Sequence, residues 1–83
     1  MNYKIHRNLD LKGEVCPYTF VKSKLVMEEM GVGEVLRVIV DFEPASKNIP
    51  KSFNIEGQSI LKAEKINDTD WEIIIRKDVD HNS

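Results

Sequence analysis

The 83-residue chain has little of several residue types on which other protein classes depend, and each shortage excludes something. It has a single cysteine, Cys16, which excludes a disulfide and dithiol redox chemistry within one chain. Besides Cys16, the only soft metal ligands are His6 and His81, too few for a tetrahedral zinc site of four soft ligands. We therefore expect no metal ion and no cofactor.

Long apolar runs are also missing. No apolar run exceeds three residues, so no segment of the sequence can span a bilayer. The first residues, Met-Asn-Tyr-Lys-Ile, lack the apolar stretch of a secretory signal. We expect a cytoplasmic protein that does not associate with membranes.

Charge of one sign is not in large excess. The formal net charge of -2 gives no general attraction to nucleic acid, so we expect no direct binding to it. The basic residues Lys12, Lys22 and Lys24 lie in the first third of the chain, either as a basic patch or as an ordinary solvated surface. The length allows one domain over residues 1–83, with an ordered core over about 3–78 and a tail over 79–83.

The apolar pattern predicts six elements in the order β-α-β-α-β-β. Alternation predicts strands at 4–11 and 34–42, and the four-residue turn 67–70 predicts a hairpin of strands 59–66 and 71–77. A loop over 12–15 leads to a helix that Pro17 begins and that ends near Met30. A second helix starts around Pro44 and ends at Gly57, with Ser46 as its cap and Pro50 near its first turn. We expect an α/β protein, more narrowly an α+β two-layer sandwich: a four-stranded mixed sheet with two helices on one face.

The first helix has apolar residues on two sides. Its expected core stripe consists of Phe20, Ser23, Met27 and Met30. Val21 and Leu25 form a second apolar pair, which we interpret as packing against a neighbouring helix, with a partner surface as the alternative.

Cys16 is the strongest candidate for chemistry. It lies between a loop and a helix start, where the free N–H groups of Tyr18 and Thr19 and the helix dipole favour a thiolate. Such a thiolate is a nucleophile that needs no buried base. A cysteine hydrolase is not expected, because it needs an oriented histidine, an oxyanion hole and a substrate cleft, and His6 is ten residues upstream on a strand. Asp41 and the other carboxylates have no assigned role.

The run Leu9-Asp10-Leu11-Lys12-Gly13-Glu14-Val15-Cys16-Pro17 resembles the L-D-x-R/K-G-x-x-C-P signature of the TusA/SirA family of sulfur carriers. The similarity continues to Ile74-x-Arg76-Lys77 and covers nearly the whole chain. It implies a fold like the C-terminal domain of bacterial translation initiation factor three. The family often has a second proline where this chain has Thr19, so the Cys-Pro-Tyr-Thr form resembles a variant branch.

The resemblance also implies a function. Cys16 would accept sulfane sulfur as a persulfide from a cysteine desulfurase or another sulfurtransferase and relay it to an acceptor protein. Pro17, Tyr18 and Thr19 would support the thiolate, and the protein would act as a monomeric sulfurtransferase. The docking candidates are Lys12, Lys22, Lys24, Phe42 and Phe53. The alternative is a non-catalytic regulatory or redox-sensing module that uses Cys16 for intermolecular disulfides.

Overall fold

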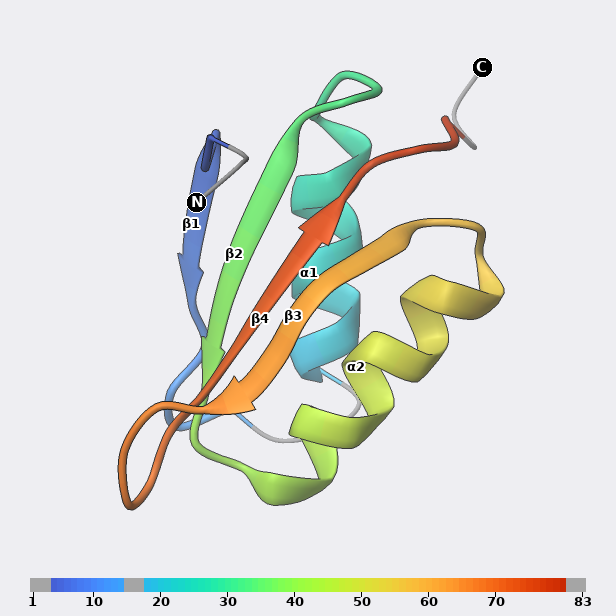
Figure 1. Ribbon diagram of the computed structural model, residues 1–83. Coiled ribbons are helices and arrows are strands. Elements are labelled where there is room, and N and C mark those ends of the chain that lie inside the picture. Colours follow the sequence, from blue (N-terminus) through green and yellow to red (C-terminus); the bar gives the residue numbers. More distant parts are fainter. Residues whose placement is uncertain (1–3, 15–17, 81–83) are drawn as a thin grey trace.

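The computed structural model describes residues 4–14 and 18–80, and its elements follow the predicted order. In chain order they are β1 (Arg7–Asp10), α1 (Tyr18–Glu28), β2 (Val35–Val40), α2 (Glu43–Ile55), β3 (Ser59–Lys65) and β4 (Trp71–Arg76). Both helices cover one face of a single sheet, as Figure 1 shows. The predicted two-layer α+β class is confirmed.

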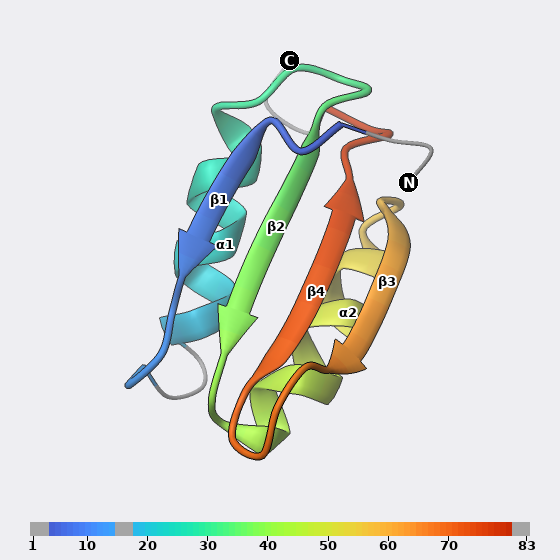
Figure 2. The ribbon, with the colours of Figure 1, turned by 60° about the vertical axis from the view of Figure 1, so that its left-hand side comes forward.

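The four strands lie in the order β1-β2-β4-β3, which Figure 2 shows from the face opposite the helices. β1 pairs with β2 in parallel, whereas β4 pairs antiparallel with both β2 and β3. The parallel pair requires a crossover, and α1 supplies it. β2 is therefore a central strand, as its apolar residues on both faces predict.

The core lies between the sheet and the two helices. Leu36, Val38 and Val40 of β2 alternate toward the helices and are fully buried. Ile73 and Ile75 of β4 lie opposite Val38 and Leu36 in the register and are also fully buried. Rings from the two helices meet above them, since Phe20 and Phe53 have centroids 5.1 Å apart.

α1 confirms one predicted face and contradicts the other. Ser23 and Met27 are buried as expected. Val21 and Leu25 are 47% and 55% exposed, so the expectation that they pack against a neighbouring helix is wrong. α2 lies on the Phe20 side of α1, and the described chain has no further helix to cover the opposite side.

α2 begins earlier than predicted. Its N-cap residue is Phe42, without a side-chain capping bond, and Ser46 is not the cap because its Oγ donates to the Glu43 carbonyl at 2.6 Å. With the start at Glu43, Pro50 lies inside the helix rather than in its first turn, where it cannot donate to the Ser46 carbonyl. Gly57 follows the helix with φ of 94°, as the predicted helix end requires.

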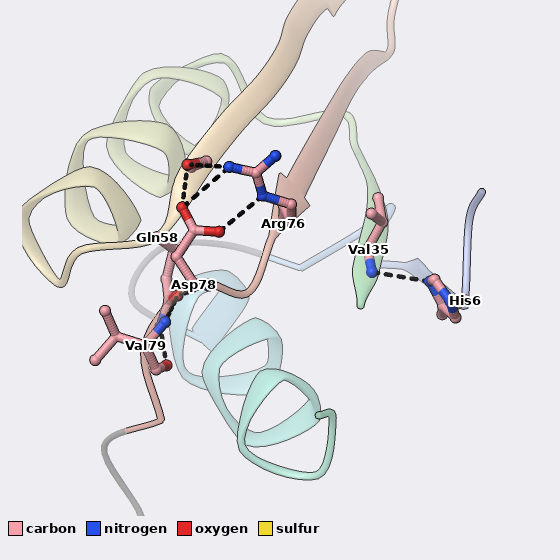
Figure 3. A network of polar contacts seen from close by, with 7 residues as sticks. His6, Val35, Gln58, Arg76, Asp78 and Val79 are labelled. Carbon is pink, nitrogen blue, oxygen red and sulfur yellow. Dashed lines mark hydrogen bonds and ion pairs between the residues drawn. The ribbon is translucent and has the colours of Figure 1, made fainter. Parts of the chain in front are cut away.

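The segment after β4 is fastened to the loop after α2. The buried Gln58 side chain accepts hydrogen bonds from the backbone N–H groups of Asp78 (2.7 Å) and Val79 (3.0 Å) and donates to the Val79 carbonyl (Figure 3). Beside it, the Arg76 guanidinium and the Ser59 hydroxyl hold the pKa of the Asp78 carboxyl below its ordinary value. These contacts extend the order of the chain past the last strand.

The open face of the sheet carries an ion cluster. Glu72 is only 7% exposed and lies between Arg37 of β2 and Lys62 of β3, with its carboxylate 2.9 Å from the Lys62 Nζ. Lys62, followed by Arg37, holds the pKa of Glu72 below its ordinary value against the effect of burial.

Neither helix in the described part of the chain has the length and apolarity needed to cross a lipid bilayer.

The C-terminal end of α1 is closed by a buried lysine. Lys77 is 2% exposed, and its Nζ donates to the carbonyls of Met27 (2.8 Å) and Met30 (2.6 Å). The last carbonyls of a helix have no helical donors and form the negative end of the helix dipole. The ammonium group therefore supplies both hydrogen bonds and a complementary charge.

Replacing Lys77 by methionine keeps the volume and removes the ammonium group. We expect Lys77→Met to lower the free energy of unfolding by about 2–3 kcal/mol, because the carbonyls of Met27 and Met30 each lose the hydrogen bond from the ammonium group, and Met27 keeps the one from the Met30 N–H at 3.1 Å. Urea unfolding of this variant beside Lys51→Met, which alters an exposed lysine of α2, measures the effect. Equal midpoints for the two variants would contradict the capping role.

Candidate functional site

The loop that precedes Cys16 leaves the sheet where β1 and β2 end. Because these strands are parallel, their carboxyl ends meet at the same edge, with Asp10 opposite Ile39. The Leu11 N–H donates to the Ile39 carbonyl at 2.8 Å, so the pairing extends one residue beyond β1. The Leu11 side chain is 2% exposed and anchors the start of the loop in the core.

Two carboxylates hold the loop itself. Asp10 Oδ1 accepts the backbone N–H of Lys12 at 3.0 Å, and Asp41 Oδ1 accepts that of Gly13 at 2.9 Å. Gly13 has φ of 88°, a conformation that other residues rarely adopt. The Glu14 N–H closes the turn on the Leu11 carbonyl at 3.0 Å. Both aspartates act here as acceptors that fix the backbone.

Glu14 also connects the loop to α1. Its carboxylate forms an ion pair with the ammonium group of Lys22, in the second turn of the helix. Cys16 and Pro17, the centre of the predicted site, lie outside the described residues. The structure therefore describes the residues on either side of this segment, Glu14 and Tyr18. The Glu14–Lys22 ion pair connects the loop before the segment to the helix after it.

The first turn of α1 directs different residues outward and inward. Tyr18 is 62% exposed, whereas Thr19 is fully buried. The Thr19 carbonyl accepts the Ser23 hydroxyl at 2.7 Å, and the Thr19 Oγ1 has no hydrogen-bond partner within residues 4–14 and 18–80. Of the residues predicted to support a thiolate, Tyr18 and Thr19 are thus placed at the helix start.

The three predicted basic residues do not lie together. Lys12 is exposed in the loop, and Lys22 reaches the same loop through Glu14. Lys24 lies toward α2 instead, with its Nζ 3.2 Å from the Glu56 carboxylate and 6.0 Å from the centroid of the Phe20 ring. Only Lys12 and Lys22 therefore border the site.

The two predicted docking aromatics are not open surface residues. Phe53 is 1% exposed, so its proposed docking role is wrong; it lies one helical turn after Ile49 on the inner face of α2 and belongs to the core. Phe42 is half-buried and packs against the same core.

His6 lies at the opposite end of β1 from the loop. Its Nδ1 accepts the Val35 backbone N–H at 3.1 Å, which Figure 3 shows, and its side chain is otherwise exposed. The expectation that His6 is not a catalytic base agrees with this placement, because the length of β1 separates it from the loop that begins at Leu11.

Sequence reasoning missed the role of Asp41. It directly follows β2, and the residue type alone indicates only an exposed acid at a strand end. The available signal was the parallel pairing, which places the residue after β2 beside the loop after β1. Recognising it required the strand order as well as the strand positions.

Comparisons with known proteins agree on one family. The family model described as "Sulfurtransferase TusA" matches residues 7–77. A protein of Archaeoglobus fulgidus named "Putative sulfur carrier protein" is 51% identical over 83% of this chain and 78% of its own length. An equally named protein of Thermotoga maritima is 32% identical over 89% and 94%, respectively. A solved SirA-like protein of Desulfitobacterium hafniense superposes with a TM-score of 0.75 and 28% identity, covering 88% of this chain and 99% of that one.

Removing the Asp41 carboxylate should free the loop without disturbing the core, because Asp41 is exposed. We expect Asp41→Ala to speed hydrogen exchange at the Gly13 amide about tenfold, which corresponds to a lost hydrogen bond of ~1–1.5 kcal/mol. Asp41→Asn keeps an acceptor oxygen and should retain most of the protection. Amide exchange followed by NMR measures both, and equal Gly13 exchange in Asp41→Ala and the unaltered protein would contradict the tether.

Proposed function

We propose that this chain, which belongs to the TusA family of sulfurtransferases and is a sulfur carrier, accepts sulfane sulfur as a persulfide on Cys16 and relays it to an acceptor protein. The observation that carries the proposal is the tethered loop. Asp10 and Asp41 fix the backbone up to Gly13, three residues before the only cysteine of the chain. A carrier needs its sulfur at a defined and reachable place, and a loop fastened to a sheet edge is such a place.

The proposed transfer balances without an oxidant. The Cys16 thiolate attacks the outer sulfur of a donor persulfide and forms a new S–S bond, while the S–S bond of the donor breaks and the donor leaves as a thiolate. The transferred sulfur keeps its proton or exchanges it with water. An acceptor thiolate then attacks the same outer sulfur, and Cys16 leaves as the thiolate with which the cycle began.

The neighbourhood of Cys16 supports the thiolate form. The first backbone N–H groups of α1, including those of Tyr18 and Thr19, have no helical acceptors and lie at the positive end of the helix dipole. Pro17 suits the first helical position because it has no N–H to leave unpaired. Lys12 and Lys22 add positive charge at the loop, although Glu14 offsets that of Lys22.

The rest of the proposal concerns the setting. We propose a single domain over residues 1–83 that works as a monomer in the cytoplasm, where thiols are kept reduced. Its donor is a cysteine desulfurase or another sulfurtransferase, and its acceptor is a downstream protein of the same relay. The transfer needs no cofactor on this chain, because the nucleophile and the leaving group are both sulfur.

Intact-protein mass spectrometry tests the role of Cys16. After incubation with a cysteine desulfurase, pyridoxal phosphate and cysteine, the unaltered protein should gain one sulfur atom, and a reductant should remove it. Cys16→Ser should gain none, because a hydroxyl cannot form the persulfide. A matched control is Ser46→Ala, which alters a hydroxyl on α2 and should load like the unaltered protein.

A different mass would favour the alternative function. If oxidation yields Cys16-linked dimers or mixed disulfides while no donor enzyme adds sulfur, Cys16 is a redox-sensing residue and the carrier proposal is wrong.

A further inference from the structure

The start of β1 is fastened to β2 by two hydrogen bonds between the same two residues. The His6 N–H donates to the Val35 carbonyl at 2.9 Å, and the Val35 N–H donates to the His6 Nδ1 at 3.1 Å (Figure 3). The β1–β2 ladder begins one residue later, with Arg7 opposite Leu36. The His6–Val35 pair therefore extends the contact between the two strands beyond the ladder.

The bond to the ring nitrogen forms only while the imidazole is neutral. A backbone N–H can only donate, so the Nδ1 must accept with its lone pair, and the ring proton is on Nε2. A protonated imidazole has an N–H at both nitrogens and accepts no hydrogen bond. A backbone carbonyl, the usual acceptor in a parallel ladder, stays an acceptor at every pH. This bond is therefore sensitive to pH, whereas the ladder bonds are not.

Val35 has no ready substitute for the ring nitrogen. It is the first residue of β2, a central strand, and it is 2% exposed. After release its N–H would have little access to water, and a buried donor without an acceptor is costly. The bond from the His6 N–H to the Val35 carbonyl joins two backbone groups and does not depend on the ring. Protonation of His6 thus removes one of the two bonds and leaves the other.

The charged groups around His6 provide no ion pair for a protonated ring. Within residues 4–14 and 18–80, His6 takes part in none of the ion pairs. Glu34, next to Val35, accepts the Gly31 N–H at 2.8 Å, and Glu29, which follows α1, pairs with Arg7 at 3.8 Å. The charged residues nearest in chain and register are mostly cationic: Lys4 and Arg7 on its own segment, Glu34 and Arg37 on β2, and Arg76, which lies opposite Val35 on β4. The lost hydrogen bond is therefore not exchanged for an ion pair.

We propose that His6 is a pH-sensitive latch on the start of β1. The neutral ring holds the strand to Val35, and protonation of the ring releases the Val35 N–H and loosens the first residues of β1. Histidine is the side chain whose charge ordinarily changes between about pH 5 and 8, so mild acidification is the signal. β1 has only four residues and lies at the edge of the sheet, so each contact with β2 is a sizeable share of what holds it. The inference is independent of the chemistry of Cys16.

Amide exchange followed by NMR on the whole chain tests the latch at about pH 7.5 and about pH 5, with each rate divided by its intrinsic value at that pH. The variant His6→Asn keeps a neutral acceptor, since its Oδ1 is as many bonds from the Cα as the histidine Nδ1. The variant His6→Leu has no acceptor at either pH. The Leu11 amide, bonded to the Ile39 carbonyl at the other end of β1, is the internal reference.

We expect the protection of the Val35 amide to fall about tenfold from the higher to the lower pH in the unaltered protein, the effect of losing one hydrogen bond. His6→Asn should keep its protection at both values, and His6→Leu should show the low protection at both. The Leu11 amide should change less than about twofold, because its bond joins backbone groups. The nitrogen shifts of the His6 ring should show one protonated nitrogen at the higher pH and two at the lower.

Four results would overturn the inference. Equal Val35 protection at the two pH values, with the ring protonated at the lower one, would show that the imidazole is not the latch. The same fall in His6→Asn would assign the pH dependence to another group. An equal loss at Leu11 would show general unfolding instead of release at one end of the strand. A His6 ring that is still neutral at the lower pH would place the switch outside the range in which histidine acts.

Discussion

The parallel pairing of β1 with β2 is the constraint on which the rest of the molecule depends. It places the carboxyl ends of both strands at one edge of the sheet, so the loop after β1 lies beside the first residue after β2. Asp41 can therefore accept the Gly13 N–H across 28 residues of sequence. An antiparallel pair would place these ends at opposite edges of the sheet and leave the loop without this tether.

α1 is held at both ends by polar contacts. The Glu14–Lys22 ion pair joins its second turn to the loop, and the buried Lys77 ammonium closes its last turn. The Gln58 side chain accepts hydrogen bonds from the backbone N–H groups of Asp78 and Val79 and so fastens the segment that follows Lys77. The helix thus gains order from polar contacts at its ends, so its outer face can carry apolar residues that the fold does not use.

The order of the elements and the fold class follow from the sequence, because alternation and helical spacing are local signals. The same signals placed Ser23 and Met27 in the core, but they could not show that Val21 and Leu25 lack a neighbour, because that depends on where α2 packs. Phe53 was misjudged for a related reason: an aromatic residue on a helix reads as core or surface only when the sheet beneath it is known. Asp41 was missed because its partner, Gly13, lies in the loop after a different strand.

The central claim is that Cys16 carries sulfur in its working state, and its mass in the native cell tests this most directly. The protein would be isolated from its own organism without reductant and its cysteine-containing peptide measured intact. The account predicts a fraction with one additional sulfur atom on Cys16, which a reductant removes. A peptide found only as the free thiol or as a disulfide with another protein would contradict it.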